Sequence, residues 1–222
     1  MTASQWELLW TSLGPIVSGA VTGTIPLALT SFALGLAIAL GIALARLSRV
    51  RAVSAAARVY ISIIRGTPLL VKLFVIFYGL PSVGVLLDPW PSAIIAFALN
   101  VGGYGAEVIR AAILSVPVGQ WEAGHTIGMS RGQTLRRIIL PQAARVSVPP
   151  LSNTFISLVK DTSLASLILV TELFRRAQEI ATFSNEFMLL YLEAAVVYWV
   201  ICLVLSSGQN VLEKRLDRYV AH

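Results

Sequence analysis

The sequence predicts an all-α membrane protein with about five transmembrane helices, an N-terminus outside the cell and a C-terminus in the cytoplasm. Three observations predict this class. Of the 222 residues, 56% are hydrophobic, only 13% are charged, and long apolar runs alternate with short polar segments. A soluble domain is nearer a quarter charged, so this chain has more apolar surface than a soluble fold can bury. A channel-like or transporter subunit is therefore favoured over a soluble enzyme.

Five apolar runs are long enough to cross a bilayer, which takes about 20 residues of helix. The first run is uncharged, and the second is interrupted by Pro68. The third and fourth carry charged residues within them, and the fifth ends before a basic tail. The predicted spans are 22–45, 59–80, 91–114, 146–170 and 188–207.

The positions of lysine and arginine predict the orientation, because both are enriched in cytoplasmic loops. The loop 81–90 has neither, and the loop after the fourth run mixes signs: Glu172, Arg175, Arg176, Glu179 and Glu186. The opposite side carries most of the cations: Arg46, Arg49, Arg51, Arg58, Arg131, Arg136, Arg137, Arg145, Lys214, Arg215 and Arg218. The net charge of +6 therefore reflects membrane orientation and indicates no nucleic-acid partner.

The segment before the first run, 4–19, is expected to lie at the membrane interface. Trp6 and Trp10 are residue types that favour the headgroup level. Gly19 and Gly23 form a GxxxG pair, which permits close contact between helices, although this spacing is common by chance.

The polar segment 117–141 is expected to form two short cytoplasmic helices with a bend. Gly124 and Gly128 lie four residues apart and would share one face of a helix over 120–128, and Gly128 also suits a turn. Ser130 and Gln133 have the spacing of a capping box. The second helix should end near Pro141, since proline does not continue a helix simply. From the residues alone, a connector and a docking element are equally open.

A resemblance favours docking. The pattern E-A-G-x-x-x-G followed by I-x-L-P resembles the EAA loop of ABC importer permeases, on residues Glu122, Ala123, Gly124, Gly128, Ile138, Leu140 and Pro141. Further motifs resemble the polar amino acid subfamily, which imports histidine, glutamine, arginine and cystine: RGTPLLVKLF, GYGAEVIRAAI, LPQAARVSVPPLSNTFISLVKDTSLAS and VTEL. The resemblance covers about 19–209 of one permease domain spanning 1–222. Gly124 stands where this family usually has alanine.

The resemblance implies a bacterial cytoplasmic (inner) membrane protein that spans the membrane several times. It also implies an ABC ATPase dimer, a second permease subunit that is identical or paralogous, and an extracytoplasmic solute-binding protein. In the coupling loop, Glu122 would be the polar contact to the ATPase, with Ala123, Gly124 and Gly128 as the close-approach surface. The chain has no GxxxxGK[ST] motif, so we expect it to be a transport subunit and not an enzyme, without a cofactor, and with ATP bound by the partner.

Charged residues inside the spans are candidates for the substrate route, since such groups are costly in lipid. Lys160 and Asp161 lie about 20 Å into the fourth run and point about 100° apart on a helix. We expect Asn100, Lys160 and Asp161 to line the route of an amino acid, which carries both charges. A structural tie between spans is the alternative. Glu107, also a route candidate, is three residues before Arg110 and can pair with it.

Two other functions stay open on the sequence alone. The EAA loop is shared by permeases for other solutes, such as methionine or an inorganic anion. The other open function is that of a membrane scaffold, which recruits a cytoplasmic partner through the same loop. Such a scaffold would have no reason to keep Lys160 and Asp161 deep in the membrane. No metal site is expected from one cysteine and two histidines.

Overall fold

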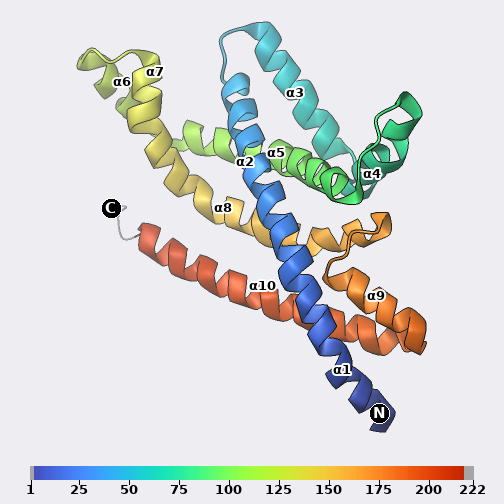
Figure 1. Ribbon diagram of the computed structural model, residues 1–222. Coiled ribbons are helices and arrows are strands. Elements are labelled where there is room, and N and C mark those ends of the chain that lie inside the picture. Colours follow the sequence, from blue (N-terminus) through green and yellow to red (C-terminus); the bar gives the residue numbers. More distant parts are fainter. Residues whose placement is uncertain (1–2, 218–222) are drawn as a thin grey trace. The chain divides into compact units, whose positions relative to one another are not determined.

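The computed structural model describes residues 3–217, and these form only helices and the connections between them (Figure 1). The α-helices are α1 (Ala3–Gly19), α2 (Ile25–Arg46), α3 (Arg51–Gly66), α4 (Leu69–Phe74), α5 (Pro89–Ser115), α6 (Val118–Thr126), α7 (Arg131–Thr134), α8 (Leu140–Asp161), α9 (Leu173–Ser184) and α10 (Phe187–Asp217). Shorter π-helical or 3₁₀ turns are η1 (Ala20–Thr24), η2 (Val75–Gly79), η3 (Leu80–Val83), η4 (Leu135–Ile139) and η5 (Thr162–Ile168). The all-α prediction is confirmed. Arg218, which entered the orientation argument, lies outside the described residues.

The described helices include several that are long and apolar enough to cross a membrane. Three pass this criterion alone: Ala3–Arg46, Pro89–Ser115 and Phe187–Arg215. The number rises to five if each of two bent helix pairs counts as one span. One pair breaks at Pro68, as the sequence predicted, and the other breaks between Ile168 and Leu173.

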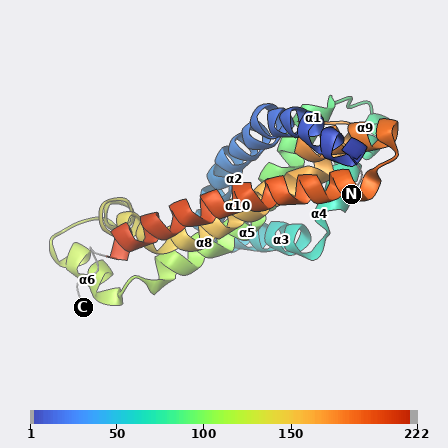
Figure 2. The same cartoon turned by 90° about the horizontal axis from the view of Figure 1, so that it is seen from below.

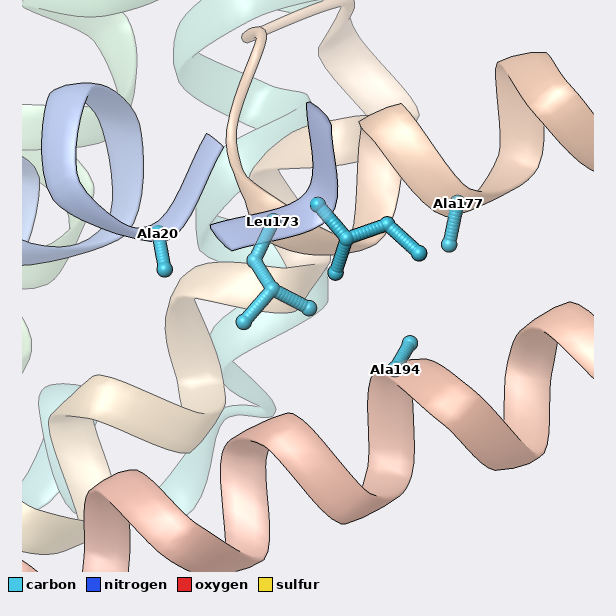
Figure 3. Close-up of a cluster of buried hydrophobic side chains, with 5 residues drawn as sticks. Ala20, Leu173, Ala177 and Ala194 are labelled. Carbon is cyan, nitrogen blue, oxygen red and sulfur yellow. The ribbon is translucent and has the colours of Figure 1, made fainter. Parts of the chain in front are cut away.

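The chain divides into two compact units, and the first contains residues 3–33, 67–98 and 155–208. In this unit α1, α9 and α10 lie side by side (Figures 1 and 2). Figure 3 shows their shared core, in which Ala20, Ala177 and Ala194 surround the fully buried Leu173. Small side chains allow helix backbones to approach closely, and this close packing is the main attraction between helices in a membrane.

The GxxxG pair contributes to this packing, which confirms the predicted close contact. A Cβ atom on Gly19 would lie 2.8 Å from Cγ of Arg176. A Cβ on Gly23 would lie 2.5 Å from the carbonyl oxygen of Thr171. Two helical segments far apart in sequence therefore touch at positions where only glycine fits without a shift.

The second unit contains 34–66, 99–154 and 209–217. Its apolar cluster joins Ala112, Ile113 and Val116 at the end of α5 to Ile139 and Ala143 near the start of α8. The partly buried Trp121 of α6 packs against this cluster. The short helices between α5 and α8 are thus held on the ends of two long ones.

The predicted helix end at Pro141 is wrong, because η4 and α8 continue the helix through it. A proline lacks an N–H and its ring clashes with the carbonyl four residues earlier. The π-helical turn η4 ends two residues before Pro141, and η1 and η2 end at the same distance before Pro26 and Pro81. A π turn changes the hydrogen-bond register just where the proline would clash, so the helix continues instead of ending.

Two further expectations need correction. The segment 4–19 is not separate from the first span, since α1, η1 and α2 form one helical stretch from Ala3 to Arg46. The loop expected after the fourth run contains helix α9, and Glu172 at its start is fully buried and not a solvated loop charge. Glu172 is a polar residue that faces other helices and not water.

Candidate functional site

The segment between α5 and α8 folds as short helices joined by a tight turn, as predicted. At the end of α6, the N–H of Gly128 donates to the carbonyl of His125 and that of Met129 to the carbonyl of Gly124, both at 3.0 Å. Gly128 has a φ of 77°. This bond pair is a Schellman motif, whose left-handed residue is usually glycine. Gly128 is therefore required by the turn itself.

The predicted capping box at Ser130 is confirmed. Oγ of Ser130 accepts from the N–H of Gln133 at 3.3 Å, and Oε1 of Gln133 accepts from the N–H of Ser130 at 2.8 Å. The guanidinium of Arg131 lies 5.8 Å from the ring centre of Trp121. These contacts hold α7 against α6 in a fixed arrangement.

The predicted shared face of Gly124 and Gly128 is wrong, since α6 ends at Thr126 and Gly128 lies in the turn beyond it. Gly124 is buried and faces α7. A Cβ at this position would lie 2.6 Å from Cγ2 and 2.7 Å from Oγ1 of Thr134. Gly124, which stands where an alanine was expected, is thus covered by Thr134 of the same chain.

Replacing Gly124 with alanine is expected to lower the free energy of unfolding by about 1–3 kcal/mol, the usual cost of overpacking. Adding Thr134→Ala removes both atoms that the new methyl group meets and should restore most of the loss. Thermal unfolding of the purified chain measures the effect. Gly132→Ala on α7 is the matched control, because its surroundings are open. An equal loss of stability in G124A and G132A would contradict the proposed clash.

The outward side of α6 carries Glu122 and Ala123, which are both exposed. Ile127 follows the helix and is 74% exposed. This surface places one carboxylate beside apolar side chains, and its residues are open to a partner. The docking roles of Glu122, Ala123, Gly124 and Gly128 stay predictions, and the structure adds that Gly124 is covered by Thr134.

The charged residues of α5 form the predicted pair. Nη2 of Arg110 lies 2.8 Å from Oε2 of Glu107, and Nε of Arg46 lies 3.7 Å from Oε1 of the same carboxylate. Glu107 is therefore shared by two guanidinium groups. Asn100 lies seven residues earlier on α5, so it projects from the same side of this helix.

Lys160 and Asp161 are the last residues of α8, and the 3₁₀ turn η5 begins directly after them. The helix geometry therefore changes directly after this pair. Lys160 is exposed and Asp161 half-buried, and the described residues show no salt bridge between the two. Asn100 and Glu107 belong to the second unit and Lys160 and Asp161 to the first. A common substrate route stays a prediction.

Sequence reasoning missed the role of Glu172. Its side chain caps α9 by accepting from the N–H groups of Phe174 at 2.9 Å and Arg175 at 2.6 Å. It is the only acidic residue among the fully buried side chains of the described chain. The sequence offered little signal for this role, because the preferred N-cap residues are Ser, Thr, Asp and Asn and not Glu.

Comparison with known proteins agrees with these features. Residues 37–218 match the family described as binding-protein-dependent transport system inner membrane component. The chain is 61% identical over 221 residues to the L-cystine transport system permease protein TcyB of Bacillus subtilis, covering 99% of this chain and 94% of that protein. It is 37% identical over 214 residues to the glutamine transport system permease protein GlnP of Escherichia coli K12, covering 96% and 97% respectively.

The fold agrees as well. A crystal structure of an amino acid ABC transporter with histidines matches with a TM-score of 0.89 and 32% identity, covering 97% of this chain and all of that one. The agreement extends over nearly the full length in both sequence and fold. The chain therefore belongs to the family of binding-protein-dependent transport system inner membrane components.

Proposed function

We propose that this chain is the permease subunit of an ABC importer that moves a polar amino acid, with cystine as the first candidate, across a bacterial cytoplasmic membrane. The observation that carries the proposal is the 61% identity to an L-cystine permease along almost the whole chain. An identity of this level over 99% of the chain supports a similar solute and similar partners.

The proposed topology has five spans, with the N-terminus outside and the tail in the cytoplasm. Each bent helix pair then crosses once, which gives the five spans that length and composition allow. The excess of arginine around 46–58 and 131–145 supports a cytoplasmic position for these segments. The whole chain acts as a single permease domain, although it contains two compact units.

The proposed assembly contains a second permease subunit, an ATPase dimer and an extracytoplasmic solute-binding protein. ATP is bound and hydrolysed by the ATPase, so this chain needs no cofactor of its own. Transport proceeds by alternating access, in which closure of the ATPase dimer is transmitted to the spans. The capping box of α7 and the Arg131–Trp121 contact between α7 and α6 support this role, because a docking element that transmits movement has to be stiff.

We infer that the ATPase contacts the outward side of α6, through Glu122 and Ala123. Replacing Ala123 with arginine should lower uptake at least tenfold and weaken copurification of the ATPase, because a long charged side chain prevents close approach. Folding should be unaffected, since Ala123 is exposed. Val50→Arg, an exposed site on the same proposed side, is the matched control. Normal uptake by A123R would remove Ala123 from the docking surface.

In the membrane, Lys160 and Asp161 offer one charge of each sign, and Asn100 offers an amide. An amino acid zwitterion brings the complementary charges, so its desolvation can be offset along a route lined by these groups. Glu107 is assigned to the same route, although its pairing with Arg110 and Arg46 leaves it less free to bind a ligand.

The deciding experiment is reconstitution of the complete transporter in liposomes. Stimulated ATP hydrolysis and uptake are measured with cystine, histidine, glutamine, arginine, methionine and an inorganic anion. We expect the strongest response to cystine. A response only to methionine or an anion would assign another solute, and copurification of the ATPase without any response would favour a scaffold.

A further inference from the structure

The carboxylate of Glu172 lies at the junction of three helical segments of the first unit. Its Oε2 accepts from the hydroxyl of Tyr198 on α10 at 2.7 Å and from the hydroxyl of Thr24 in η1 at 3.3 Å. Thr24 in turn accepts from the N–H of Leu173 at 3.2 Å. Both Glu172 and Thr24 are fully buried. A buried carboxylate is tolerated only when its oxygens are satisfied, and these are.

The two oxygens of Glu172 have separate tasks. Oε1 accepts only the N–H of Arg175, which caps α9. Oε2 also helps the cap through Phe174, but in addition it receives the bonds from Tyr198 and Thr24 on other elements. The tie to Tyr198 can therefore be removed while the two N–H bonds that cap α9 remain.

The segment after Lys160 and Asp161 leads directly to this cluster. Thr162, the first residue of η5, is fully buried, and its hydroxyl donates to the carbonyl of Val159 at 2.7 Å. Further along η5, Ala165, Ser166 and Ile168 are buried as well. Most of the segment is thus packed inside the first unit, whereas Lys160 is exposed.

The end of η5 is held in an uncommon conformation. Leu169 has a φ of 65°, which a residue with a side chain rarely adopts. The turn is closed by bonds from the N–H of Leu169 to Ser166 and from the N–H of Val170 to Ala165, both at 3.1 Å. Such a conformation persists only where its surroundings determine it, and Glu172 lies three residues further on.

We propose that Glu172 is a positioning residue for transport: its bonds to Tyr198 and Thr24 anchor the end of the segment that starts at Lys160 and Asp161 and runs through η5, and this anchor keeps the two residues in the geometry that receives the substrate. This inference rests on the proposed function, because it assigns the substrate route to the end of α8. Glu172 itself touches no substrate. Loss of its bond to Tyr198 should therefore weaken substrate binding, while the chain stays folded.

Tyr198→Phe tests the proposal in the complete reconstituted transporter. It removes one hydroxyl and retains the ring and the cap of α9, so folding should survive. The KM for cystine uptake is expected to rise about tenfold, the factor typical of losing one hydrogen bond to a charged group. The maximal rate per folded transporter should change far less. Glu172→Gln replaces one acceptor by a donor and should raise KM at least as much.

Hydrogen–deuterium exchange gives a readout that does not need transport. The amides of 162–170 should exchange faster in Y198F and E172Q than in the unchanged chain. Ser12→Ala is the matched control: it removes a 2.6 Å bond from α1 to the carboxylate of Glu193 on α10, away from η5. It should alter neither KM nor exchange in 162–170.

An unchanged KM in Y198F, or an equal rise in S12A, would overturn the positioning role. Normal exchange in 162–170 for both Y198F and E172Q would overturn it as well. A transporter that takes up no solute at all would instead remove the proposed function, and the exchange experiment would still decide whether Glu172 holds η5.

Discussion

Replacing Gly23 with alanine is expected to lower the free energy of unfolding by about 3 kcal/mol, toward the upper end for an overpacked site. The added Cβ would lie 2.5 Å from the carbonyl oxygen of Thr171 and 2.6 Å from Cα of Glu172. Both are backbone atoms, which cannot rotate away. The Tm of the purified chain in detergent and its yield as a monodisperse species measure this loss.

Gly14→Ala is the matched control for this substitution. It lies on α1 of the same continuous helix, and an added Cβ there meets nothing within 4 Å. Alanine favours a helix over glycine, so the control should be neutral or slightly stabilising. A G23A chain with the Tm of the G14A chain would show that the contact between η1 and the start of α9 tolerates a side chain.

Replacing Asp161 with asparagine is expected to lower uptake by the reconstituted transporter about tenfold or more. The substitution keeps the shape of the side chain and removes its charge, so the amino group of a substrate loses its ionic partner. Uptake is measured at low substrate concentration, with the amount of folded transporter determined in parallel.

Asp88→Asn controls for the loss of one negative charge, since Asp88 is exposed and lies before α5. Its uptake should equal that of the unchanged chain. If D161N also transports normally and folds normally, Asp161 serves as a structural tie, and the route has to be sought elsewhere.

Local features were predictable wherever short-range chemistry decides the conformation. The Ser130–Gln133 capping box depends only on residues three apart, and it forms as expected. The pairing of Glu107 with Arg110 is equally local, since the two residues lie three apart on one helix. The three prolines that follow π-helical turns show the limit: the residue identifies a disturbance, but neighbouring helices decide whether the chain ends, bends or continues.

The coupling loop illustrates the same limit within one motif. The sequence indicated that Gly124 and Gly128 matter, because two glycines four apart leave a helix face bare. Only the folded chain shows that Gly128 forms the turn and that Gly124 receives Thr134. The contact of Gly124 depends on a residue ten positions away, and nothing in the spacing of the glycines reports it.

The sequence by itself determined the class of the protein, the apolar runs, the order of its motifs and the family to which it belongs, because these depend on composition and on short patterns. The tertiary structure alone decided the role of Glu172. Its charge indicates a loop exposed to water, yet four donors from η1, α9 and α10 satisfy it in a buried position. Those donors are supplied by segments separated by up to 148 residues, and only folding brings them together.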